Sequence, residues 1–170
     1  MRHMTYSAMF LALALILPFL TGQIPQIGSA LLPMHLPVLL CGFICGPFWG
    51  AVVGFAAPIL RGVIFGMPPL FPTGIAMAIE LLTYGLVCGL LYRCLKGKKW
   101  NILISLLCAM CLGRLVWGIV RVIMAGLSQS SFTWAIFLAG AFTNAIPGIL
   151  LQIVLIPVLV KAIERAGLTL

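Results

Sequence analysis

The chain has 170 residues, of which 64% are hydrophobic and only 7% are charged. Soluble domains carry about 25% charged residues, so this composition excludes a soluble enzyme, a secreted disulfide-rich module and a disordered tail. The net charge of +8 comes from ten basic residues against two acids, Glu80 and Glu164. We therefore expect an integral membrane protein, with room for about six spanning helices of roughly 20 residues each.

Apolar runs separated by proline, glycine and charge predict an all-α bundle of six transmembrane helices, forming a single domain over residues 1–170. In chain order the predicted spans are 5–21, 34–46, 48–65, 71–92, 101–127 and 132–160. The second run is short for a full crossing of the bilayer. The first run ends at Leu17-Pro18-Phe19 without a small-residue cleavage site, so we do not expect a signal peptide.

The basic residues outside the spans predict the orientation of the chain. They cluster at the start, between the fourth and fifth spans, and at the end: Arg2; Arg93, Lys96, Lys98 and Lys99; Lys161 and Arg165. Six spans place these three clusters on one side, and the opposite links, 22–33, 66–70 and 128–131, contain no Lys or Arg. The positive-inside rule therefore predicts a multi-pass cell-membrane protein with both termini in the cytoplasm.

Four ionisable residues lie inside the predicted spans: Arg61, Glu80, Arg114 and Arg121. A charge at this depth is costly unless it is paired or faces water, so each is a candidate functional residue. At a rise of about 1.5 Å per residue, Glu80 lies roughly 13 Å, Arg121 roughly 9 Å and Arg114 roughly 20 Å from the outer ends of their helices. Asn144 has a depth similar to that of Glu80.

Two interpretations of these charges remain open. In the first, Glu80 forms a structural ion pair with one arginine and the others reach toward the interface. In the second, an outward-facing pocket with surplus positive charge binds a small anion such as a carboxylate. Arg114 favours the pocket, because no second acid is available near the middle of the membrane. Trp117 lies on the same helix face and could cover an organic ligand or pack in the interior.

The outer links are polar but uncharged, which suits loops that close over a ligand. Gln23 lies in the longest of them, and the link 128–131 is rich in serine. His35 follows the first link and could cap the short second span or contact the ligand. The candidate substrate-binding residues are thus Arg61, Glu80, Arg114, Trp117, Arg121, Asn144, Gln23 and His35.

The sequence contains no arrangement typical of catalysis. It has no HExxH sequence, no histidine pair and no glycine-rich phosphate loop. Cys108 and Cys111 form a CxxC inside an apolar helix without a second pair, which favours packing over metal binding. We therefore expect no catalytic residue, no metal and no cofactor.

The first predicted span carries a possible docking stripe. Ala8 and Ala12 have the small-xxx-small spacing that allows helices to approach closely. On spacing alone, packing within the protein is the better interpretation.

The segment from Leu32 to Tyr92 resembles a known transporter family. Its Leu-Pro-Met-His-Leu-Pro run is followed by Gly46-Pro47-Phe48-Trp49-Gly50 and then by Phe71-Pro72-Thr73-Gly74. This layout is similar to the second to fourth helices of the substrate-binding (S) component of energy-coupling factor transporters. The resemblance implies a six-helix protein that captures a vitamin from outside, topples in the membrane and is not itself an enzyme. It also implies that Ala8 and Ala12 dock on a membrane-embedded coupling subunit, with ATP hydrolysis in two partner subunits.

The identity of the vitamin and two other functional classes stay open. A net positive pocket favours a carboxylate-bearing vitamin such as pantothenate, folate or biotin. The resemblance to the branch of the family that holds the pantothenate and folate carriers puts pantothenate first. Pyridoxine or riboflavin would fit if Glu80 and the arginines neutralise one another. The alternatives are a non-transporting six-helix scaffold and a stand-alone secondary carrier, although the two halves show no clear self-similarity.

Overall fold

The computed structural model describes residues 2–20, 30–98, 100–127 and 145–167, and these residues form helices and connections without a strand. The elements in chain order are α1 (Arg2–Leu20), α3 (His35–Cys45), α4 (Pro47–Phe65), η1 (Leu70–Gly74), α5 (Ile75–Cys94), α6 (Asn101–Leu127) and α8 (Ile146–Arg165). η1 is a short irregular turn, with an extended backbone at Phe71, that leads directly into α5. Five segments of the described chain are long and apolar enough to cross a membrane. The predicted all-α membrane fold is confirmed.

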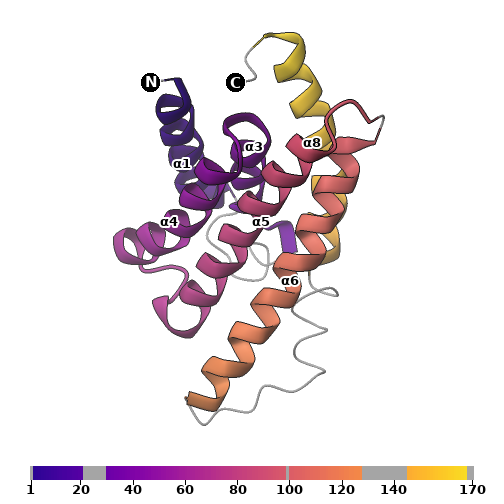
Figure 1. The fold of residues 1–170 in the computed structure, drawn as a ribbon. Helices are drawn as coiled ribbons and strands as arrows, with labels where there is room; N and C mark the ends of the chain where they lie inside the picture. The colour runs from indigo at the N-terminus through magenta and orange to yellow at the C-terminus, as the bar shows by residue number, and fades with distance from the viewer. Residues whose placement is uncertain (1, 21–29, 99, 128–144, 168–170) are drawn as a thin grey trace.

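Both ends of the chain lie at the same end of the bundle. Figure 1 shows the start of α1, the end of α8 and the α5–α6 link together at the top of the view. This end, which we call the basic end, carries Arg2, Arg93, Lys96, Lys98, Lys161 and Arg165. The charge clusters that the sequence places on one side therefore gather in space, apart from Lys99, which lies outside the described residues.

The second predicted span, 34–46, corresponds to α3, a short helix in the interior of the bundle. α3 has 11 residues, all of them buried, and its length of about 16 Å is roughly half the thickness of a bilayer core. It packs against α1, α4, α5 and α8. Burial on every side explains why the segment is apolar all round. The burial of α3 depends on these neighbouring helices and cannot be inferred from its own sequence.

The helices α3, α4 and α5 approach one another through glycine. A Cβ atom added at Gly85 would lie 2.1 Å from the carbonyl oxygen of Gly50, and one added at Gly54 would lie 2.2 Å from that of Leu81. Gly50 with Gly54, and Gly85 with Gly89, have the GxxxG spacing that brings helices into backbone contact. We call α3, α4 and α5 together the glycine-packed core.

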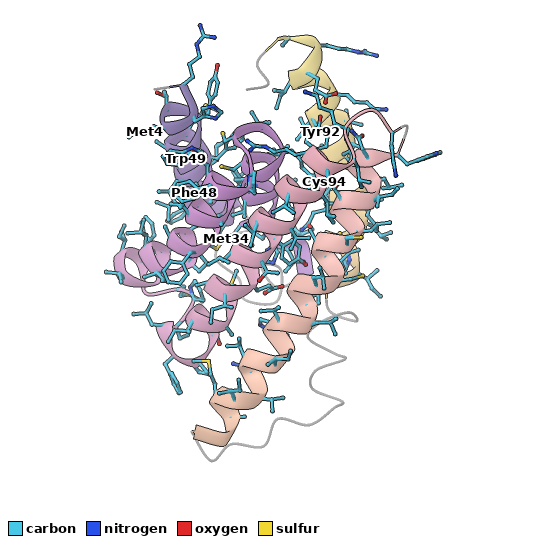
Figure 2. All side chains as sticks on the ribbon, viewed as in Figure 1. Met4, Met34, Phe48, Trp49, Tyr92 and Cys94 are labelled. Carbon is cyan, nitrogen blue, oxygen red and sulfur yellow. The ribbon has the colours of Figure 1, made fainter. Side chains whose placement is uncertain are left out.

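The outer surfaces of the helices are apolar. Phe48 on α4 and Val154 on α8 are each 68% exposed, and Figure 2 shows apolar side chains standing outward around the bundle. Met4 stands on the outside of α1 with 62% exposed, whereas Met34 lies in the interior with 3% exposed (Figure 2). Such a large exposed apolar surface is typical of a protein whose solvent is lipid.

The last predicted span, 132–160, overlaps α8 only in part. α8 begins at Ile146 and continues to Arg165, beyond the predicted end. Residues 132–144 lie outside the described part of the chain.

Candidate ligand-binding site

Glu80 on α5 is the centre of a buried charged cluster. Its side chain is 2% exposed, and its Oε1 atom lies 3.1 Å from Nη1 of Arg114 on α6. The same oxygen lies 3.4 Å from Nε2 of His35 at the start of α3. Three helices therefore each contribute one polar side chain to a single contact point, which we call the Glu80 cluster.

Helix length brings Glu80 and Arg114 to the same depth. Glu80 lies 14 residues before Cys94 at the end of α5, and Arg114 lies 13 residues after Asn101 at the start of α6. At about 1.5 Å per residue, both lie roughly 20 Å from the basic end. α5 and α6 are packed neighbours, so the two side chains meet.

The sequence leaves Arg114 without an acid of its own, because Glu80 is the one acid near the middle of the membrane and could pair with any of the arginines. The structure pairs Glu80 with Arg114 itself. A buried pair of opposite charges is less costly than either charge alone. The case for a ligand site at Arg114 therefore depends on the rest of its guanidinium.

Much of that guanidinium has no acceptor among the described residues. Arg114 is 5% exposed, and among the described residues no group accepts a hydrogen bond from its Nε or Nη2 atom. The same holds for Nδ1 of His35. Buried polar atoms are normally hydrogen-bonded, so the cluster has spare binding capacity for a group that is not part of these helices.

Tyr84 is part of the cluster, although the sequence analysis missed it. Its ring is fully buried and packs edge-to-face on the ring of His35, with centroids 5.1 Å apart. Gly113 makes room for it, because a Cβ atom there would lie 2.4 Å from the Tyr84 ring. The Tyr84 hydroxyl lies beside Arg114 without a well-aligned hydrogen bond. Its position four residues after Glu80, on the same helix face, was the available signal.

Arg121 and Trp117 continue the inner face of α6 away from the basic end. The Arg121 guanidinium lies 5.8 Å from the centre of the Trp117 ring, within the range of a cation–π contact. Both side chains are partly buried. Arg121 places a further positive charge on this face, beside Trp117.

Arg61 makes its contacts elsewhere. Its Nη1 atom donates a hydrogen bond of 2.6 Å to the Leu15 carbonyl on α1, and its guanidinium lies over the rings of Phe19 and Phe65. The structure thus places Arg61 between α1 and α4 rather than in the Glu80 cluster.

Two predicted site residues, Gln23 and Asn144, lie outside the described residues, as does the link 128–131. The cluster has no arrangement for metal binding: within the described ranges, no three His, Cys, Asp or Glu side chains are placed to hold an ion. A carboxylate, an imidazole, a phenol and a guanidinium around one point can instead bind a polar organic molecule.

The stripe on α1 is exposed. Ala8 and Ala12 lie on the outer face of the helix, whereas Ser7, Phe10 and Ala14 are buried. α1 packs inside the protein on α3 and α4. Internal packing of the two alanines, the interpretation favoured by spacing alone, is therefore wrong.

One family model matches almost the entire chain. The model of the substrate-specific component of ECF transporters covers residues 2–160. No curated protein and no solved structure shows significant similarity to the chain. Because the family match includes α1, the Glu80 cluster and most of α8, the chain belongs to the family of substrate-specific (S) components of energy-coupling factor transporters.

Proposed function

We propose that this S component captures a carboxylate-bearing vitamin from outside the cell and that Arg114 binds the carboxylate. Family membership makes the chain a substrate-binding transporter subunit rather than an enzyme, and ATP hydrolysis resides in partner subunits. Pantothenate is our first candidate, and folate and biotin follow.

The observation that carries the proposal is that the guanidinium of Arg114 has hydrogen-bond donors without acceptors among the described residues. One nitrogen faces Glu80, and the remaining Nε and Nη2 have no acceptor among the described residues. A guanidinium binds a carboxylate through two parallel N–H groups. Glu80 holds Arg114 in place, while the carboxylate of the ligand supplies the missing acceptor.

The charge of the surroundings supports an anion. Glu80 and Arg114 cancel, and Arg121 adds a positive charge above Trp117. A cationic vitamin would meet a net repulsive field, whereas a carboxylate would be attracted. Trp117 covers the organic part of the ligand in this proposal, and Gln23 and Asn144 remain predicted contacts. Arg61 has a different role here, as a link between α1 and α4.

The first test identifies the ligand. The full chain purified in detergent should carry a small molecule in stoichiometric amount, and mass spectrometry identifies it. A carboxylate-bearing vitamin would support the proposal. A cationic molecule such as thiamine would contradict it.

The second test separates charge from geometry at Arg114. Arg114→Lys keeps a cation beside Glu80 but removes the planar fork, so we expect a protein that folds and binds the co-purified carboxylate at least about tenfold more weakly. Arg114→Ala should weaken binding at least as much. Lys161→Ala, an exposed cation at the basic end, is the matched control and should bind normally. If Arg114→Lys bound the ligand with unchanged affinity, the planar guanidinium of Arg114 would not be the group that binds the carboxylate.

The orientation follows from the basic end. We propose that this end faces the cytoplasm, because it gathers the lysines and arginines outside the helices. Glu80 and Arg114 then lie about 20 Å from the cytoplasmic ends of their helices, and the ligand enters from the opposite side. Labelling of a cysteine introduced at Lys98 should require permeable reagents, and labelling by an impermeable reagent in intact cells would reverse the orientation.

The family implies association with a coupling module, and we propose Ala8 and Ala12 as its contact on this chain. Ala8→Trp or Ala12→Trp should abolish uptake in cells while leaving ligand binding by the isolated protein intact. Val158→Trp, on the exposed face of α8, is the matched control. Normal uptake by both alanine variants would place the docking surface elsewhere.

A further inference from the structure

Gln152 on α8 is a buried polar side chain that the proposed function does not use. Its side chain is 0% exposed, and among the described residues neither its amide nitrogen nor its amide oxygen has a hydrogen-bond partner. A buried amide without hydrogen-bond partners destabilises a protein, and the cost is greater within a bilayer, where no water is available as a partner. Such a residue calls for a partner that is not part of the helices.

Gln152 lies about as far along α8 from the basic end as Glu80 and Arg114 lie along α5 and α6. It is 13 residues before Arg165 at the end of α8, close to the 14 residues from Glu80 to Cys94 and the 13 from Asn101 to Arg114. At about 1.5 Å per residue, all three side chains start roughly 20 Å from the basic end. The three side chains are therefore at comparable distances along their own helices from the basic end.

The packing of α8 directs Gln152 toward the interior. α8 contacts α3 and α6, the helices that carry His35 and Arg114. One turn before Gln152, a Cβ atom at Gly148 would lie 2.6 Å from the carbonyl oxygen of Ala30, in the segment that leads into α3. A buried side chain on this face of α8 points to the helices of the Glu80 cluster and not to lipid.

We propose that Gln152 is a specificity-determining residue whose side-chain amide pairs with a neutral amide or ureido group of the captured ligand. The inference rests on the proposed function, which assigns the carboxylate of the same ligand to Arg114. A glutamine amide both donates and accepts hydrogen bonds, and an amide or ureido group presents the complementary pair. Pantothenate carries an amide and biotin a ureido group, whereas lipoate is a carboxylate with neither.

A purely structural role of Gln152 predicts a different stability for the ligand-free variant. If Gln152 held a buried water that bridges helices, its removal would lower the stability of the ligand-free protein. If its partner is the ligand, removing the amide from the empty protein relieves an unsatisfied group and leaves stability unchanged or higher.

The test compares Gln152→Met with Ser105→Ala in the full chain purified in detergent. Methionine keeps the length of the side chain and removes its hydrogen-bonding groups. Ser105 is a matched control because it is also fully buried, with an Oγ atom that has no partner among the described residues. It lies four residues after Asn101, only about 6 Å from the basic end. The probes are pantothenate, biotin, lipoate and panthenol, the alcohol analogue of pantothenate, measured by calorimetry and thermal unfolding.

We expect the wild-type protein to bind pantothenate or biotin more tightly than lipoate. Gln152→Met should weaken binding of the preferred probe at least about tenfold, since the ligand amide then loses its partner. Lipoate affinity should change by less than about twofold, because this carboxylate makes no amide contact. The melting temperature without ligand should stay the same or rise, and Ser105→Ala should leave all affinities unchanged.

Three results would overturn the inference. These are an unchanged affinity of Gln152→Met for the preferred probe, a lower melting temperature of the empty variant, and a wild-type preference for lipoate. Failure of the proposed function has a separate signature, since the wild type would then bind panthenol as tightly as pantothenate. Binding of none of the four probes by the wild type would overturn both.

Discussion

The glycine-packed core and the Glu80 cluster adjoin each other and are built in opposite ways. In the core, backbone meets backbone at Gly50 and Gly85, and no side chain intervenes. In the cluster, Glu80 and Arg114 bring charge into the bundle, and Arg114 and His35 have polar atoms without partners among the described residues. The regions meet where the Leu81 carbonyl abuts Gly54, one residue after Glu80. A rigid, close-packed support beside a costly polar group is what a binding site requires.

The largest effect should come from removing the acid of the cluster. Glu80→Ala leaves Arg114 buried without its counter-charge, which should destabilise the fold by about 3–5 kcal/mol. Glu80→Gln keeps an acceptor and should lose less. Unfolding in detergent measures both, and an Ala variant as stable as the wild type would show that the ion pair does not support the fold.

A smaller effect is expected in the glycine-packed core. Gly85→Ala places a Cβ atom 2.1 Å from the Gly50 carbonyl oxygen, so α4 and α5 must separate. Overpacking of this kind costs about 1–3 kcal/mol. Gly126→Ala on α6 is the control, because a Cβ atom there meets nothing within 4 Å. Equal melting temperatures for the two variants would show that the backbone contact is dispensable.

The smallest effect on stability is expected at Arg61, and the same variant tests whether this residue contacts the ligand. Arg61→Met removes the hydrogen bond to Leu15 and the contacts with Phe19 and Phe65, at a cost of about 1 kcal/mol. Ligand affinity should stay within about twofold of the wild type, since Arg61 contacts α1 rather than the ligand. A tenfold weaker affinity with unchanged stability would return Arg61 to the ligand site.

The fold class was predictable because it depends on composition and on long apolar runs, the strongest signals in a sequence. The burial of α3 was not predictable, because a short apolar segment has the same composition whether it faces lipid or lies inside a bundle. Its 11 buried residues are set by four neighbouring helices.

The site was predictable in its residue types but not in its pairing. Rarity made Glu80 and Arg114 visible, because a charge inside a span needs a reason. Gln152 and Tyr84 carry no charge, so their presence inside a span does not by itself mark them as candidate site residues. What distinguishes them is complete burial beside helices that are distant in the sequence. The contact of Arg61 with Leu15 was not predictable either, because it depends on how α1 packs against α4.

The half-length of α3 has an electrostatic consequence. A helix that crosses the bilayer keeps both of its ends in the interfacial region, whereas α3 begins in the interior at His35, next to Glu80. The amino end of a helix carries a partial positive charge from its aligned peptide dipoles. That charge comes from the backbone, so no side-chain substitution removes it. It stabilises the Glu80 carboxylate and leaves more of the Arg114 charge to attract an anion.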